Sequence, residues 1–295
     1  MPTLKDNVQV LAVIEQGNTS LVLVLLGERL GQIHVHAKGG RRWPKKGFEG
    51  GMDLLTRGEM VVYPRPGEML WLLKEWSEQA RPRLGRSVPM LYAASYLSEL
   101  TQALTRPTSG QAPEAPSGGD GSGARLYQLL AAAADAIASG TAPGPVILAF
   151  TLRALENEGL FPSLKTCDNC GKNLSKAGGP AWLTRAGMLC AACADAAAKV
   201  HAQSGTGREI GVRLTPDALQ ALIHVHATGL SVTLSAAGAE QLARALIVLI
   251  HSALEHDLRT LPAAARMVRA MGSRVKKKNG SPLQSPRSPE KFTAR

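Results

Sequence analysis

The stretch NVQVLAVIEQGNTSLVLVLLGERLGQIHVHAK, residues 7–38, sets the fold class of the N-terminal part of the chain. Its first two runs, residues 7–16 and 18–27, are rich in β-branched and aliphatic side chains. Gly17–Asn18 between them is a turn signal. This composition predicts two strands that follow one another closely along the chain.

The third run, residues 31–38, alternates between apolar and polar side chains. Ile33, Val35 and Ala37 share one face, and the polar residues between them share the other. A period of two predicts a strand with one buried face.

Two further candidate strands follow at residues 53–64 and 67–76. Five short strands separated by turn residues are typical of a small closed barrel, of which the OB-fold is the five-stranded example. We therefore predict an OB-fold domain over residues 1–81.

From residue 87 the apolar residues recur at spacings of three and four, which predicts helices. Pro89 suits the start of the first helix, and Ser235 is a plausible cap for a later one. The first apolar stripe comprises Met90, Leu91, Ala94, Leu97, Leu100 and Leu104. Further helices are predicted at residues 124–139, 145–160, 215–227 and 235–261.

The whole chain therefore predicts an α+β multidomain protein, with an α-helical domain in two parts, 82–165 and 201–272. Residues 107–123 are rich in Gly, Pro and Ser and predict a flexible loop. Residues 273–295 are basic and poor in apolar side chains, which predicts a disordered tail.

The cysteines stand in two C-x2-C pairs that are separated by nineteen residues: Cys167, Cys170, Cys190 and Cys193. This spacing is typical of zinc sites, because one tight turn can place both sulfurs of a pair on one ion. Four thiolates leave no position for water, so we predict one structural Zn²⁺ ion in a module of residues 166–200. The alternative is four thiols that never meet.

The sequence AWLTRAGMLC, residues 181–190, predicts a short hairpin that turns at Ala186–Gly187 and returns Cys190 to the metal. Arg185 at its tip, together with Lys172 and Lys176, offers positive charge to phosphate. Between a nucleic-acid finger and a purely structural module, we favour the structural role.

The net charge of +11 favours a polyanionic partner such as nucleic acid. No acidic residue lies between Leu30 and Phe48, a segment that contains Lys38, Arg41, Arg42, Lys45 and Lys46. Trp43 among these cations offers a flat face to a base. We predict nucleic-acid binding by these six residues; a solvated basic loop is the alternative.

Several classes of protein are disfavoured. The sequence lacks the G-x-x-x-x-G-K-[ST] loop of P-loop nucleotide hydrolases. Its densest acidic groups, Glu156–Glu158 and Glu255–Asp257, fall in predicted helices, where residues i and i+2 point apart and cannot share a metal ion. We expect a protein that is not an enzyme. We do not expect the first residues to be a signal peptide, because no long apolar stretch follows them, and no apolar run approaches the roughly 20 residues of a membrane helix. We therefore also expect the protein in the cytoplasm, associated with the nucleoid.

The order of these features resembles the RecO family of recombination mediator proteins. The resemblance extends over about residues 7–272 and rests on VHAKGGRRWPKKG (35–47), LYAASYLSELTQALTRP (91–107), LRALENEGLFPSLKTCDNCG (152–171), the second CxxC and IHSALEHDLRTL (250–261).

The resemblance implies an N-terminal OB-fold, a helical domain and, as in many members, a zinc-binding insertion. It also implies binding of single- and double-stranded DNA, annealing of complementary strands, and help in loading a RecA-type recombinase, with RecR, onto strands coated by single-strand-binding protein. Members contact the acidic C-terminal tail of that protein through the helical domain. No motif assigns this contact to residues here; Arg125 and Arg153 are basic residues of the region.

The chain departs from the shared pattern in its 107–123 loop and in its tail. Aromatic residues are scarce on the presumed barrel, so charge should contribute more to DNA binding than base stacking. Two other functions stay open at this stage. One is a zinc-ribbon nucleic-acid-binding interaction protein in transcription or RNA metabolism, and the other is an enzyme whose acidic residues converge only in three dimensions.

Overall fold

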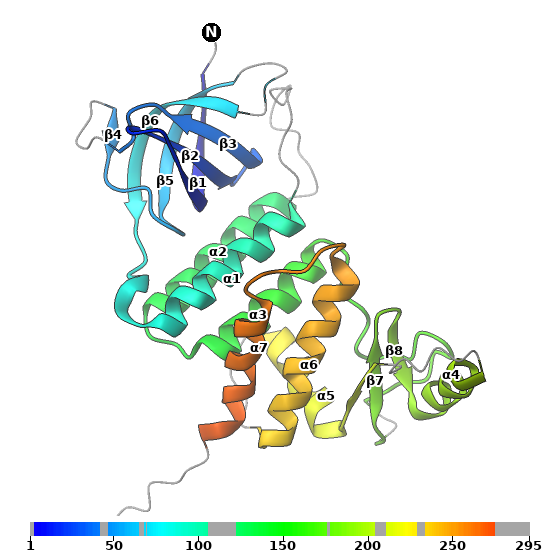
Figure 1. Cartoon of the computed structure of the whole chain (residues 1–295). Helices are drawn as coiled ribbons and strands as arrows, with labels where there is room; N and C mark the ends of the chain where they lie inside the picture. Colours follow the sequence, from blue (N-terminus) through cyan, green and yellow to red (C-terminus); the bar gives the residue numbers. More distant parts are fainter. Residues whose placement is uncertain are drawn as a thin grey trace, which may run out of the picture.

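The computed structural model describes residues 3–41, 47–64, 68, 70–105, 122–175, 178–203, 211–228 and 234–274. Figure 1 shows an N-terminal β-barrel beside a group of helices, and a small sheet with one helix on the other side of that group. This is the predicted α+β architecture. Most of the predicted loop 107–123 and of the tail 273–295 lies outside the described residues, although Ser122 and Gly123 form the start of a helix.

The barrel consists of five long strands and one short one: β1 (Leu4–Gln16), β2 (Ser20–Gly27), β3 (Gly31–Ala37), β4 (Phe48–Glu49), β5 (Arg57–Tyr63) and β6 (Leu70–Ala80). Their order in the sheet is β3-β2-β1-β5-β6-β4, and a parallel pairing of β3 with β6 closes the barrel. A five-stranded closed barrel was predicted from the sequence, and the prediction is confirmed.

Alternating side chains divide each strand between the inside and the outside of the barrel. On β3, Ile33, Val35 and Ala37 fill the interior together with Leu23 and Leu25 of β2, as the period of two predicted. The burial of these side chains fixes the register, because a slip of one residue would turn every one of them outward.

The helices are α1 (Val88–Leu104), α2 (Ser122–Ala138), α3 (Pro143–Asn157), α4 (Ala191–Gln203), α5 (Pro216–Thr228), α6 (Ala236–Ala253) and α7 (Leu261–Arg269), with short 3-10 turns at Leu84–Arg86 and Ala270–Arg274. The predicted caps are confirmed for α1, where Ser87 accepts from the N–H of Met90, and for α6, where Ser235 accepts from the N–H of Gly238. Among the described helices, none is long and apolar enough to cross a membrane.

Two details of the helix prediction were wrong. Leu91 is 45% exposed, because α1 buries Ala93 and Tyr96 instead. The helix predicted over residues 235–261 is divided: α6 ends at Ala253, Leu254 is extended, and α7 begins at Leu261. The acidic group Glu255–Asp257 therefore lies in the bend between two helices and not within one.

The outer face of the barrel packs on α1 and α2. A β-bulge between Val10 and Ala12 lets Leu11 point outward, where it joins Val24, Leu26 and the helices in one hydrophobic core. The hydroxyl of Ser98 donates to the carbonyl of Leu11 at this contact.

Polar contacts support the same junction. The Thr105 hydroxyl donates to Gln32 Oε1 at 2.5 Å, and Arg57 of β5 pairs with Asp135 of α2 at 2.8 Å. The barrel is therefore held against the helices by apolar and polar contacts together.

The cysteine-bearing module contains a second sheet, with the order β8-β7-β9. Its strands are β7 (Ala181–Thr184), β8 (Gly187–Cys190) and β9 (Val212–Leu214). β9 lies beyond the stretch 166–200 that we predicted for the module and leads directly into α5, so the sheet is continuous with the helical region.

Glu99 of α1 holds the start of α7. Its carboxylate accepts hydrogen bonds from the backbone N–H groups of Arg259 (2.8 Å) and Thr260 (2.9 Å) and from the Thr260 hydroxyl (2.5 Å). Burial is the largest influence on the pKa of Glu99 and raises it, but the hydrogen bonds from Thr260 and Arg259 together lower this pKa below its ordinary value. These hydrogen bonds therefore stabilise the ionised form of Glu99. Through them Glu99 caps a helix to which it does not belong.

This arrangement predicts a pH-dependent loss of stability in the Glu99→Gln variant. A carboxyl whose pKa is lower in the folded state stabilises the fold above its unfolded pKa, and the contribution disappears as the pH falls through the folded pKa. In urea unfolding at pH 7 we expect a loss of about 1 kcal/mol, allowing for solvent screening. The difference from the wild type should shrink below the ordinary pKa of 4.5.

Glu255→Gln is the matched control, because Glu255 is exposed in the bend after α6. It should leave the free energy of unfolding unchanged. A Glu99→Gln variant as stable as the wild type at pH 7 would show that the cap contributes nothing.

Candidate metal centre and nucleic-acid interface

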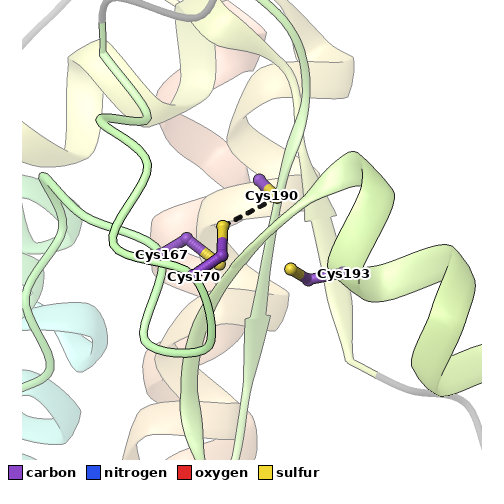
Figure 2. Close-up of side chains that lie close together, drawn as sticks. All are labelled: Cys167, Cys170, Cys190 and Cys193. Atoms are coloured by element: carbon purple, nitrogen blue, oxygen red, sulfur yellow. Dashed lines mark hydrogen bonds between the residues drawn. The ribbon is translucent and has the colours of Figure 1, made fainter.

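The four cysteine side chains point toward one another, as Figure 2 shows. Cys167 and Cys170 lie in the loop after α3, Cys190 ends β8, and Cys193 lies in the first turn of α4. All four sulfurs lie within 4.8 Å of one another. Three separate elements therefore supply one cluster, and the alternative of thiols that never meet is wrong.

The sulfur spacing suits a metal ion better than a disulfide. Cys170 Sγ and Cys190 Sγ are 3.8 Å apart, whereas a disulfide bond is about 2.05 Å long. A tetrahedron of sulfurs with metal–sulfur bonds of about 2.3 Å has edges of about 3.8 Å. The cluster could hold one ion in a closed shell of four thiolates.

The first cysteine pair is shaped by a tight turn. The N–H of Gly171 donates to the carbonyl of Cys167 at 2.8 Å, and the N–H of Cys167 donates to the carbonyl of Lys172 at 2.9 Å. Gly171 has φ +70°, a left-handed conformation that glycine adopts without strain. This explains why a glycine directly follows Cys170.

Asp168 connects this turn to the hairpin that carries Cys190. Its Oδ2 accepts from the N–H of Met188 at 2.6 Å, and its own N–H donates to the carbonyl of Met188 at 2.8 Å. Gly187 has φ +123°, and a Cβ there would lie 2.1 Å from Asp168 Oδ2. Sequence reasoning missed Asp168, although an acidic residue inside a C-x2-C pair is a signal that could have identified it.

The hairpin turns one residue earlier than predicted. Arg185 and Ala186 form the turn, and Gly187 already pairs with Thr184. The Thr184 hydroxyl donates to the carbonyl of Gly187 at 2.8 Å and accepts from the N–H of Ala186 at 3.1 Å, which favours this position of the turn. Arg185 and Lys172 are exposed, and Lys176 lies outside the described residues.

The thiols differ in their affinity for protons. Burial is the largest influence on the pKa of Cys167 and raises it, but hydrogen bonds from the backbone N–H groups of Cys190, Cys170 and Asn169 lower this pKa to about 6. For Cys193, the Asn169 amide lowers the pKa, but the thiols of Cys190 and Cys170 raise it to about 12. Cys167 therefore loses its proton more readily than Cys193, which keeps its proton unless a divalent cation offsets the negative charge.

The structure describes two of the six predicted nucleic-acid contacts. Lys38 directly follows β3 and is exposed. Arg41 is anchored by its N–H, which donates to the carbonyl of Thr19 at 3.0 Å, and its guanidinium lies 3.1 Å from Glu15 Oε2. Sequence reasoning missed Glu15, because it is distant along the chain. The other four predicted contacts, Arg42, Trp43, Lys45 and Lys46, lie outside the described residues.

Most other cations of the described barrel strands and their borders have acidic partners. The pairs are Lys5–Glu59, Arg29–Asp6, Arg57–Asp135, Lys74–Glu75 and Arg81 with Asp53 and Glu78. The charges of these pairs largely cancel. Arg41 is likewise paired with Glu15, and by sequence the segment 38–46 carries five cations and no acidic residue.

A cavity of about 760 Å³ lies between α2, α3 and α5. Arg125 and Arg153 both line it, next to the apolar side chains of Leu129 and Ala132. Because the two arginines come from different helices, their convergence could not be read from spacing in the sequence.

Hydrogen bonds hold the cavity's charged groups in place. Arg153 donates to the carbonyls of His226 (3.2 Å) and Ala227 (3.3 Å) at the end of α5. Arg125 Nε donates to Asn157 Oδ1 at 3.1 Å. The cavity therefore contains two arginine side chains that hydrogen bonds keep in place beside an apolar wall.

The chain is similar to DNA repair proteins. Residues 86–206 match the family model described as "Recombination protein O C terminal". The DNA repair protein RecO of Acidithiobacillus ferrooxidans is 30% identical over 206 residues, which cover 67% of this chain and 72% of that protein. RecO of Anaeromyxobacter sp. (strain K) is 28% identical over 270 residues, or 89% of this chain and 94% of that protein. RecO of Rhodopirellula baltica is 29% identical over 187 residues, and the chain spans 64% of its length.

The position of Asp168 predicts that Asp168→Ala weakens metal binding while all four sulfurs remain. Residues that orient metal ligands typically contribute about 10- to 100-fold to affinity. We expect one metal ion per wild-type chain by elemental analysis, and a loss of that size for Asp168→Ala in competition with a chelator. Asp195→Ala, at an exposed position of α4, is the control and should bind as the wild type does. A metal-free wild type, or a variant that retains the ion equally well, would contradict this role.

Proposed function

Since this chain belongs to the RecO family, and so has a role in DNA repair and recombination, we propose that it acts as a non-enzymatic mediator. It binds single- and double-stranded DNA, anneals complementary strands and, with RecR, helps to load a RecA-type recombinase onto strands coated by single-strand-binding protein. The observation that carries the proposal is a five-stranded barrel of the OB type whose segment 38–46 contains five cations and no acidic residue. The partnership with RecR rests on family membership.

Annealing follows from contacts that are electrostatic and independent of base sequence. Lysine and arginine neutralise phosphates and release counterions, so two strands can approach each other. Contacts to phosphate do not occupy the base edges, which remain available for pairing. The ion pair of Arg41 with Glu15 is exposed on both sides and is therefore weak enough to be replaced by a phosphate.

Charge reversal tests this proposal. The variant Arg41→Glu/Arg42→Glu places two acidic groups in the segment, one of them next to Glu15, so phosphates should be repelled. We expect the wild type to accelerate pairing of complementary oligonucleotides without ATP or added metal, and the variant to lose this activity. The measurement is the rate of duplex formation at low salt.

The matched control is Lys165→Glu/Lys199→Glu, which makes the same change in charge at exposed positions in the loop before Cys167 and on α4. It should anneal at nearly the wild-type rate. If both variants lose activity equally, net charge rather than the barrel segment drives annealing; if neither does, the segment has no part in it.

We propose that the metal ion is zinc. The closed set of four thiolates in two C-x2-C pairs supports this choice, because zinc favours tetrahedral sulfur coordination and such sites are structural. The ion would hold the loop after α3, the β7–β8 hairpin and the start of α4 together. The elemental analysis of the wild-type chain described above also identifies the element.

We propose the cavity lined by Arg125 and Arg153 as the site for the acidic C-terminal tail of single-strand-binding protein. Its two arginines would bind carboxylates, and its apolar wall would take an apolar side chain of the tail. Glu156 also lines the cavity, but its carboxylate lies 2.9 Å from His226 Nε2, which engages it. The site therefore favours a short acidic peptide with apolar residues.

The Arg125→Glu variant tests this assignment with little risk to the fold, because Arg125 is exposed. Reversing its charge should weaken binding of a peptide with the tail sequence at least roughly tenfold, as measured by fluorescence anisotropy. Arg266→Glu, at an exposed position of α7, is the control and should bind the peptide normally. Equal affinity of Arg125→Glu and wild type would exclude this cavity.

A further inference from the structure

One of the four cysteines is more accessible to solvent than the others. Cys170 is exposed, whereas Cys167 and Cys190 are buried and Cys193 is half-buried. Cys170 lies in the tight turn of the first pair, and a Cβ on the next residue, Gly171, would meet no atom within 4 Å. The space beside this turn is therefore open, so a small molecule in solution can reach the Cys170 sulfur.

The exposed sulfur has a second sulfur within reach. Cys170 Sγ lies 3.8 Å from Cys190 Sγ. A disulfide bond is about 2.05 Å long, so the two sulfurs would have to approach by about 1.8 Å to form one. Cys190 is fixed at the end of β8, where it pairs with Ala181 of β7, whereas Cys170 lies in a loop. A small movement of that loop would bring the two sulfurs together.

The ligands of the cluster are not equally well anchored by other contacts. Leu183 of β7 and Met188 of β8 belong to the hydrophobic core that the helices share with the outer face of the barrel. The first cysteine pair is bonded to β8 through Asp168 and Met188. Of the described side chains of α4, Cys193 alone packs against that core. Loss of the metal ion would therefore loosen α4 before the strands.

We propose that Cys170 is a site of oxidation by peroxides, and that its oxidation joins it to Cys190, expels the metal ion and frees α4. This proposal rests on the zinc site proposed above. Oxidants attack the thiolate form of cysteine, and metal coordination keeps a thiol in that form. Zn²⁺ has no redox chemistry of its own, so the electrons must come from sulfur.

The oxidation proceeds in two balanced steps. The Cys170 thiolate attacks one oxygen of hydrogen peroxide, which gives a sulfenic acid and a hydroxide ion. The Cys190 thiolate then attacks the sulfenic sulfur, so that the disulfide forms and a second hydroxide ion leaves. Two electrons have passed from the two sulfurs to the peroxide. The thiolates of Cys167 and Cys193 remain, and they are too few to close a tetrahedral shell. A thiol reductant reverses the change.

The experiment treats the zinc-loaded full chain with hydrogen peroxide and follows free zinc with a chromogenic chelator. We expect the loss of one zinc ion for every two thiols oxidised. Peptide mapping by mass spectrometry should find the Cys170–Cys190 disulfide. In a parallel reaction with dimedone, which traps sulfenic acids, Cys170 should be labelled first. Trypsin should cleave after Lys199, an exposed residue of α4, faster in the oxidised chain than in the reduced one.

Two matched variants separate the exposed thiol from the others. Cys170→His and Cys193→His each leave three thiolates and one imidazole, a ligand set that also occurs in structural zinc sites. We expect both variants to bind one ion. Cys170→His lacks the exposed thiol and should keep its zinc in peroxide, whereas Cys193→His retains Cys170 and should lose zinc as the wild type does. If neither variant binds zinc, the labelling of the wild type decides.

Several results would overturn this proposal and leave the zinc site intact. They are retention of zinc by the wild type in peroxide, first labelling of another cysteine, a disulfide other than Cys170–Cys190, equal loss of zinc from the two variants, and unchanged cleavage after Lys199. A wild-type chain that contains no metal would overturn the zinc site and this proposal together.

Discussion

The contact between the outer face of the barrel and α1 is the constraint on which the other features depend. Because Leu11, Val24 and Leu26 point outward into the core of the helices, the barrel and the helical region share one hydrophobic core. The helices thereby cover one part of the β1–β2–β3 face. Lys38, which directly follows β3, and Arg41 are exposed.

The cysteine cluster would stabilise its part of the molecule through a bound metal ion. Its four sulfurs come from a loop, a strand and a helix, so one ion would hold these three elements together. The sheet of the module continues through β9 into α5, whose last residues accept hydrogen bonds from Arg153 in the cavity. We therefore interpret the module as a brace for the helical region, and the barrel as the part that meets DNA.

Local sequence patterns predicted the features that depend on residues close together along the chain. The five long strands, the caps Ser87 and Ser235 and the cysteine spacing all follow from short stretches of sequence, and the structure has them. Features that depend on distant residues could not be predicted in this way. One example is the pairing of Arg41 with Glu15, and another is the convergence of Arg125 and Arg153 on one cavity. The hydrogen bond between Asp168 and Met188 and the addition of β9 to the module are further examples. The same holds for the division of α6 from α7, where Glu99 caps the second helix.

The proposed function depends on electrostatic capture of a DNA strand by the barrel segment. The most direct measurement is the affinity of the full chain for an unstructured single strand as a function of salt concentration. We expect tight binding at low salt and a steep linear decline of log affinity with log salt, with a slope of roughly −0.7 per phosphate neutralised. Replacing Lys38 and Arg41 with alanine should make that slope shallower. No binding at low salt, or a slope that does not respond to these two residues, would contradict the role of the barrel segment.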